Sequence, residues 1–138
     1  MIGTAEQDAF VREHKYSVVT TLRADGSPTN SVIFTIPVGD TDELFFSTTV
    51  DRLKTRTVEN DNRIAVSFLD EGPPYRFVTV EGTAVVQRED VVDLHIALNK
   101  AMRGGDFTPP DDFAAILAKQ GRVIIRITGE RVSGVTAR

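Results

Sequence analysis

Three hydroxyl side chains followed closely by three cations form the stretch of this chain best suited to chemistry. An apolar run ends in Ser47-Thr48-Thr49, and Arg52, Lys54 and Arg56 follow it. Asp51 lies between the two groups and is a favoured N-cap, because its carboxylate accepts the free amide hydrogens of a first helical turn. Hydroxyls, a helix start and cations together predict an anion site, most simply for a phosphate. The alternatives are a solvated basic helix face and, for the hydroxyls, a helix-capping loop.

The charge of the whole chain makes this cluster stand out. The net charge is −4 and the sequence pI is about 5.1, so the protein is acidic overall. The stretch from Ser47 to Arg56 is the one place in the sequence where cations gather beside a row of hydroxyls. Since no sustained Lys/Arg stripe occurs elsewhere, nucleic acid is not expected to be a partner.

Several other kinds of site are not expected. The chain has no cysteine, which excludes disulfides, thiolate metal sites and thiol catalysis. Its two histidines, His14 and His95, stand far apart without metal-ligand spacing, so we expect surface or partly buried side chains and no metal. No Gly-x-Ser-x-Gly occurs, and no histidine is expected to act as a base for a serine. Glycine-rich phosphate loops are absent too, so we expect a bound cofactor to carry any chemistry.

The N-terminal fifteen residues are mixed in charge and contain no long apolar run. We therefore expect neither a signal peptide nor a membrane span, and a cytoplasmic protein.

Periodicity and turn residues predict a single domain over residues 1–138 with many strands and few helices. Asp25-Gly26 between two β-branched runs indicates a hairpin, Gly82 inside a long strand indicates a bulge, and Gly121 is expected to close a helix. Thr4 and Gln7 fit a capping box at the start of the first helix. The predicted helices span 5–14, 51–59, 90–102 and 111–119, and the predicted strands span 16–24, 28–37, 43–48, 63–69, 75–88 and 122–135.

Six strands joined mainly by hairpins predict a mainly β fold, a small antiparallel barrel with short helices that plug its ends or cover a gap. The repeated β-α units of a doubly wound sheet are missing. A six-stranded barrel has a narrow core, so a sizeable ligand is expected outside it, in a groove. A second subunit completes such a groove most simply, which predicts a homodimer.

The order of five segments resembles the pyridoxamine-5′-phosphate-oxidase-like split β-barrel family, known as the FMN-binding split barrel. The resemblance is greatest to the actinobacterial branch that binds the deazaflavin coenzyme F420, and it covers about residues 10 to 134. The segments that carry it are Thr20–Pro28, Phe46–Thr49, Arg52–Arg56, Asp61–Ser67 and Val80–Ala84.

The resemblance implies roles for particular residues, beginning with the cofactor phosphate. It implies that Arg52, Lys54 and Arg56 hold the phosphate, and that Ser47 and Thr48 lie beside the phosphate or the ribityl chain. On a helix Arg52 and Arg56 share a face, whereas Lys54 lies about 200° away from each. Either all three meet the phosphate in an irregular first turn, or Lys54 binds it with one arginine while the other pairs with an acid. We favour the second arrangement.

For the tricyclic ring, the resemblance implies contacts with the second strand and with an aromatic residue of the fifth strand, which reaches the ligand across the dimer. Tyr75 stands at that aromatic position, where relatives commonly have Trp, and Arg76 follows it. A barrel-rim aromatic is the alternative for Tyr75. The second-strand residues that would contact the ring are Thr29, Ser31, Val32 and Ile33.

The resemblance thus implies an oxidoreductase in which reduced F420 passes a hydride to a small organic acceptor such as an enone or a quinone. An FMN-dependent oxidoreductase of the same fold is the first alternative. The second is a protein that carries a flavin or F420 without catalysing a reaction.

Overall fold

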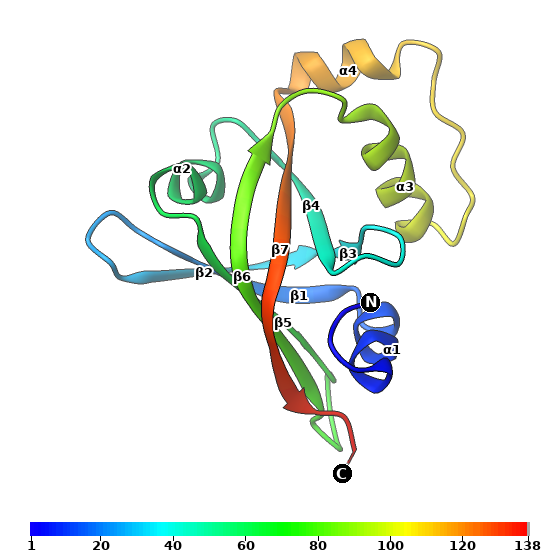
Figure 1. The fold of residues 1–138 in the computed structure, drawn as a ribbon. Coiled ribbons are helices and arrows are strands. Elements are labelled where there is room, and N and C mark those ends of the chain that lie inside the picture. The colour runs from blue at the N-terminus through cyan, green and yellow to red at the C-terminus, as the bar shows by residue number, and fades with distance from the viewer. Residues whose placement is uncertain (138) are drawn as a thin grey trace.

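The computed structural model describes residues 1–137 (Figure 1). Seven strands and four helices follow one another along the chain. In order, they are α1 (Ala5–Glu13), β1 (Tyr16–Leu22), β2 (Pro28–Phe34), β3 (Ile36–Pro37), β4 (Glu43–Thr49), α2 (Leu53–Asn60), β5 (Arg63–Leu69), β6 (Phe77–Gln87), α3 (Val92–Met102), α4 (Phe113–Gln120) and β7 (Arg122–Val135).

The strands form one antiparallel sheet in the order β2-β1-β5-β6-β7-β4-β3. Its two edge strands, β2 and β3, are separated in the sequence by Thr35 alone. The sheet must therefore curl until its edges meet at that residue, which gives the predicted split barrel. The expected count of six strands was one too low, because the predicted strand 28–37 is divided between β2 and β3.

Thr35 divides the strand because its backbone and its side chain both form hydrogen bonds with residues at the start of β1 or just before it. Its N–H donates to the Lys15 carbonyl at 2.8 Å, and its hydroxyl accepts from Ser17 Oγ at 3.0 Å. Thr35 is fully buried. The two sides of the break have opposite environments: Val32 is 72% exposed, whereas Ile36 is buried.

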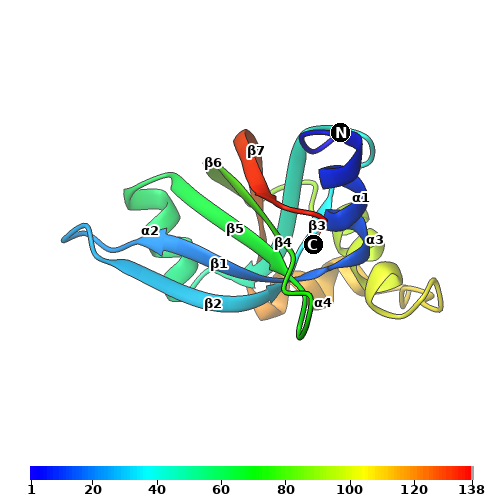
Figure 2. The same cartoon turned by 90° about the horizontal axis from the view of Figure 1, so that it is seen from below.

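The barrel core is built from the inward side chains of the long strands and is closed by two helices. Phe46, Phe68 and Ile125 are buried in it. α1 adds Phe10 to this core, and α2 adds Val58. These two helices lie at opposite ends of the sheet, as the two views show (Figures 1 and 2). The prediction that helices plug the ends of the barrel is thus confirmed for α1 and α2.

The helical pair α3 and α4 lies outside the barrel instead (Figure 1). Leu98 of α3 packs with Phe45 and Ile124 in a second apolar cluster on the outer side of β4 and β7. Val123, Ile124 and Ile125 are consecutive and all buried, because here the sheet is covered on both faces. The sequence pattern predicts Ile125 and Ile127 on one face and Ile124 on the other, and the two clusters confirm it.

Local chemistry places most element boundaries where the sequence predicts them. The capping box of Thr4 and Gln7 is present at α1. Gly121 ends α4 in the left-handed conformation, with φ of 66°. The predicted bulge falls at Glu81/Gly82, where a Cβ on Gly82 would lie 1.9 Å from the Thr128 carbonyl oxygen. Only glycine allows β6 and β7 to approach this closely.

Candidate functional site

The three predicted phosphate ligands lie at the start of α2, and we call them the α2 cluster. Arg52 stands at the N-cap position, Lys54 lies in the first turn and is half-buried, and Arg56 is exposed. Among residues 1–137, none of the three forms an ion pair within 4 Å. Burial and the neighbouring charge of Arg52 lower the pKa of Lys54. Asp51 is the nearby acid that interacts with Arg52 and Arg56, and Arg56 also donates to the Asp51 carbonyl at 3.3 Å. Lys54 keeps a positive charge with no acid within 4 Å among the described residues.

Asp51 does not cap α2, and that prediction was wrong. Its carboxylate accepts instead from the Thr49 hydroxyl at 2.5 Å, and no side chain caps the helix. The Thr55 hydroxyl donates to the Thr49 carbonyl at 2.7 Å, which holds the turn before the helix. The free amide hydrogens of the first turn, like the cations, are thus left without a side-chain acceptor.

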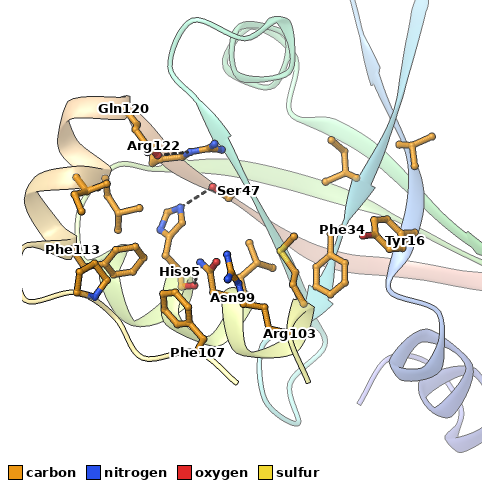
Figure 3. Close-up of a pocket in the computed structure, with 17 residues that line it drawn as sticks. Tyr16, Phe34, Ser47, His95, Asn99, Arg103, Phe107, Phe113, Gln120 and Arg122 are labelled. Carbon is orange, nitrogen blue, oxygen red and sulfur yellow. Dashed lines mark hydrogen bonds between the residues drawn. The ribbon is translucent and has the colours of Figure 1, made fainter. Parts of the chain in front are cut away.

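A cavity of about 610 Å³ forms a groove between the outer face of the sheet and the α3–α4 pair (Figure 3). This volume suits a small organic ligand. Most lining side chains are apolar or aromatic, two are arginines, and none of the described lining residues is acidic. They are Tyr16, Val32, Ile33, Phe34, Ser47, His95, Leu98, Asn99, Met102, Arg103, Phe107, Pro110, Phe113, Ile116, Leu117, Gln120 and Arg122.

A hydrogen-bonded pair, Ser47 and His95, lies in the wall of this groove (Figure 3). Ser47 Oγ is 2.7 Å from His95 Nε2, and His95 Nδ1 is 2.7 Å from the Val91 carbonyl oxygen. A carbonyl oxygen only accepts, so Nδ1 must carry a proton. In the neutral ring Nε2 is then an acceptor, and the Ser47 hydroxyl donates to it.

The surroundings of His95 favour that neutral form. Its side chain is 3% exposed, and burial lowers its pKa. The hydrogen bond to Val91 acts in the opposite direction, and the positive charge of Arg122 lowers the pKa further. Asn99 Nδ2 donates to the His95 carbonyl at 2.8 Å, which helps to fix this part of α3. The expectation that no histidine is placed next to a serine was therefore wrong.

The sequence-predicted ring contacts divide between the two faces of β2. Val32 and Ile33 line the groove, together with Ser47 of β4. Thr29 and Ser31 are half-buried and pair with Thr21 and Val19 of β1, on the other side of the strand from Val32.

Thr48 likewise points away from the groove. It is 4% exposed and lies on the barrel side of β4, opposite Ser47. Thr48 therefore supports the strand from within.

Tyr75 and Arg76 lie in another place, a shallow hollow of about 330 Å³ on the outer face of the sheet. Tyr75 is 61% exposed. The Arg76 guanidinium donates to both carboxylate oxygens of Asp70, at 2.9 and 3.1 Å. Val18, which also lines this hollow, pairs with Val32 of the groove, so the two depressions adjoin across β1.

Three groove residues escaped the sequence analysis as site candidates: His95, Arg103 and Arg122. Ser47 and His95 are 48 residues apart, and Arg122 follows the glycine that ends α4. No local pattern marks such residues, because the fold alone brings them to one cavity. The one sequence signal is the position of the loop 104–110, which predicts that it lines the substrate pocket together with the strand after it. Phe107 and Pro110 of that loop do line the groove.

Two further properties concern the described residues 1–137. They include no group of three or more metal-ligating side chains placed to hold an ion. None of the helices within this range is both long enough and apolar enough to span a membrane.

Comparison with known structures gives several close folds. An F420 reductase is 26% identical, with 91% of this chain and 94% of the other covered and a TM-score of 0.72. A conserved hypothetical protein from Mycobacterium tuberculosis is 20% identical over 98% and 85% of the two chains, with a TM-score of 0.79. The heme storage protein HutZ from Vibrio cholerae is 17% identical over 96% and 94%, with a TM-score of 0.69. The last two are too distant in sequence to show more than the fold.

Comparison with curated protein sequences gives no significant match. The family model for pyridoxamine 5′-phosphate oxidase, however, matches residues 4–136. Since that match spans nearly the whole chain, the protein belongs to the pyridoxamine 5′-phosphate oxidase family.

Proposed function

We propose that this protein is an oxidoreductase that binds reduced coenzyme F420 and passes a hydride to a small organic acceptor such as an enone or a quinone. The observation that carries the proposal is Lys54, a half-buried cation at a helix start with no acidic partner among residues 1–137. Keeping a lysine partly desolvated and unpaired costs stability, which a bound phosphate offsets through charge-assisted hydrogen bonds. The 26% identity to an F420 reductase supports F420 as the cofactor.

In this proposal the α2 cluster holds the cofactor phosphate. Ser47 lies beside the part of the cofactor that links the phosphate to the ring. Thr48 supports β4 from the barrel side. The ring lies along β2 against Val32, and Ile33, Thr29 and Ser31 lie on the opposite face of the strand. The lack of any acidic residue among the described groove lining favours an anionic cofactor over a cationic one.

A second copy of the chain is part of the proposal. Val32 is 72% exposed and Tyr16 59% exposed, and both lie on the outer face of the sheet beside the groove. Leu69 and Tyr75 extend this apolar surface, which a homodimer would cover. Tyr75 would then reach the cofactor of the partner subunit. Arg76 is held by Asp70 in its own subunit, so it would approach the ligand as a neutralised pair.

When bound, reduced F420 supplies the hydride. The chain's own residues then have three tasks: to hold the phosphate, to keep the ring flat against β2, and to exclude water from the groove. No acidic side chain is needed for these tasks, in agreement with the lining of the groove.

Titration with F420 and with FMN tests the proposal. Wild-type protein is expected to bind F420 more tightly than FMN, and Lys54→Ala should weaken F420 binding about tenfold or more, because a hydrogen bond to a charged group contributes roughly 1.5–3 kcal/mol. Lys100→Ala, at an exposed lysine in the last turn of α3, is the charge-matched control and should leave the Kd unchanged. A change of less than about threefold for Lys54→Ala would reject the phosphate site.

The same titration separates the other candidates. Tighter binding of FMN would make the protein an FMN-dependent oxidoreductase with the same site. Tight binding of either cofactor, without oxidation of its reduced form by added enones or quinones, would make it a carrier. The absence of a carboxylate among the described groove residues is compatible with a carrier as well.

A further inference from the structure

The half of the groove formed by α3, α4 and the loop between them has a distinct composition. Its walls include the edge-to-face pair Phe107 and Phe113, with ring centroids 5.6 Å apart. Leu98 and Leu117 are buried at its base. An apolar cavity of this kind binds a ligand with an apolar or aromatic body.

Two arginines stand in this apolar setting without acidic partners. Arg122 is half-buried, and its Nε donates to the neutral side chain of Gln120 at 3.2 Å. Arg103 lies over the Phe107 ring, with Cζ 5.5 Å from the centroid. Within the described residues 1–137, neither arginine has a carboxylate within 4 Å. In a protein of net charge −4 with 20 acidic residues, this leaves positive charge in the groove for an anion.

Arg122 also acts on the buried His95, since its charge lowers the pKa of that ring. Arg122, His95 and Ser47 therefore belong to one end of the groove, as the close-up shows (Figure 3). The Ser47 proton is committed to His95 Nε2, so the hydroxyl presents its free lone pair to a ligand as an acceptor. An anion at Arg122 is thus best accompanied by a hydrogen-bond donor on the same ligand.

We infer that the α3–α4 half of the groove binds an amphipathic organic anion. Its apolar body packs against the joined Phe107 and Phe113 rings, its acidic group binds Arg122, and a neighbouring hydroxyl or N–H donates to Ser47. This inference rests on the proposed function, because it assigns the acceptor substrate to a class: apolar molecules that carry a single carboxylate or similar acid. Arg103 adds a weaker, more exposed contact at the mouth of the groove.

Two fluorescent probes of nearly the same shape test the charge requirement. 8-Anilinonaphthalene-1-sulfonate carries an acid, and N-phenyl-1-naphthylamine is its neutral counterpart. Arg122→Gln should weaken binding of the sulfonate about fivefold or more and change binding of the neutral probe less than about twofold, since one charge-assisted contact is lost and the apolar walls stay. Arg122→Lys should retain most of the affinity for the sulfonate, and Lys119→Gln should alter neither.

Equal weakening of both probes by Arg122→Gln would show a damaged wall and overturn the inference, as would no effect on either. If Arg122→Gln fails to fold, Arg103→Gln with the same two probes gives the test, with a smaller selective loss expected.

A last measurement separates this inference from the proposed cofactor site. With saturating F420 present, the sulfonate should still bind and should still depend on Arg122. Complete displacement of the dye by F420 would assign this half of the groove to the cofactor and overturn the inference. Failure of F420 to bind, with the dye still dependent on Arg122, would reject the proposed function and leave the anion site in place.

Discussion

Two histidines of this protein share one local arrangement but have different tertiary partners. His14, at the end of α1, and His95, in α3, each direct Nδ1 at the carbonyl oxygen four residues earlier, at 2.9 Å and 2.7 Å. That carbonyl fixes a proton on Nδ1 in both rings. The difference lies at Nε2, which meets the carboxylate of Asp70 in one case and the hydroxyl of Ser47 in the other.

The residues around His14 contact one another, and we call the group the Asp70 corner; it consists of Phe10, His14, Asp70 and Arg76. Both nitrogens of His14 lie within hydrogen-bond distance of an oxygen, the Phe10 carbonyl and the Asp70 carboxylate. The rings of His14 and Phe10 stack with centroids 3.9 Å apart. Arg76 lies over the Phe10 ring, with Cζ 5.2 Å from the ring centroid. The pKa of Asp70 lies far below its usual range, and the hydrogen bond from the Arg76 guanidinium is the largest cause. Every charge of the corner thus has a partner, and the corner joins α1 to β5 and β6.

The groove around His95 is open by comparison. The ring is neutral, its partner is a hydroxyl, and the charge beside it belongs to Arg122, which has no acid within 4 Å among residues 1–137. Charges that the protein itself pairs hold its elements together, whereas an unpaired charge beside a cavity is available to a ligand. Substitutions in the corner should therefore change stability, and substitutions in the groove should change binding.

The largest effect on folding is expected from Asp70→Asn, because this substitution removes the carboxylate that both Arg76 and His14 contact. We expect the Tm, followed by circular dichroism at pH 7, to fall by several degrees, while the affinity of the groove for the two dyes stays the same. Glu59→Gln, which breaks the exposed pair with Arg88, is the control and should leave the Tm nearly unchanged. An unaltered Tm for Asp70→Asn would mean that the corner contributes no more than an exposed ion pair.

The acid side of the stability curve sharpens that test. The pKa of Asp70 is lower in the folded than in the unfolded protein, so its stabilising effect is full above its ordinary pKa of 3.8 and is lost as the pH falls below that value. Asp70→Asn should therefore lose less stability than the wild type on acidification from pH 5 downward.

Ser47→Ala should have a smaller effect on folding, because water in the groove can replace the hydroxyl at His95 Nε2. We expect a loss of about 0.5–1.5 kcal/mol in the free energy of unfolding, measured with urea. Binding of the neutral dye should not change. A loss above about 3 kcal/mol would show that the Ser47–His95 pair is mainly a structural contact, like those of the Asp70 corner. The proposed difference between the two regions would then be wrong.

Much of the fold follows from the sequence because its signals are local. The alternation in β5 and β7 predicts both strands to the residue, and Gly82 and Gly121 mark the bulge and the helix end. The break at Thr35 could not be predicted in the same way. It depends on where the two edges of the sheet meet, and no property of residues 28–37 taken alone specifies that point.

The same distinction applies to the candidate site. The α2 cluster lies within five consecutive residues, so its charge is visible in the sequence. The groove combines residues of β2, β4, α3, α4 and β7, and its serine and histidine come from segments 48 residues apart. His14 and His95 also look alike in the sequence, since each stands among mixed neighbours, and only the tertiary partner of Nε2 distinguishes them.

The smallest effect expected is the pH dependence that His95 adds to stability. Burial lowers its pKa below the ordinary value of 6.5. Between the folded pKa and 6.5, the unfolded chain binds this proton more readily than the folded protein does. Stability should therefore rise with pH through that window, and His95→Gln should remove this part of the slope. Urea unfolding of the two proteins at several pH values between 5 and 7.5 measures the difference.

Nuclear magnetic resonance separates the two rings directly, because the chain has two histidines and hence two imidazole signals to follow. The signal of His95 should titrate with a midpoint below 6.5, and above that midpoint its ring should carry the proton on Nδ1. Protonation would reverse the hydrogen bond, since Nε2 would then donate to Ser47 and release the hydroxyl proton toward the groove. The added positive charge should strengthen binding of the sulfonate dye as the pH falls, with no such change in His95→Gln. A midpoint at or above 6.5 would mean that burial does not favour the neutral ring of His95, and the proposed contrast between the groove and the Asp70 corner would then fail.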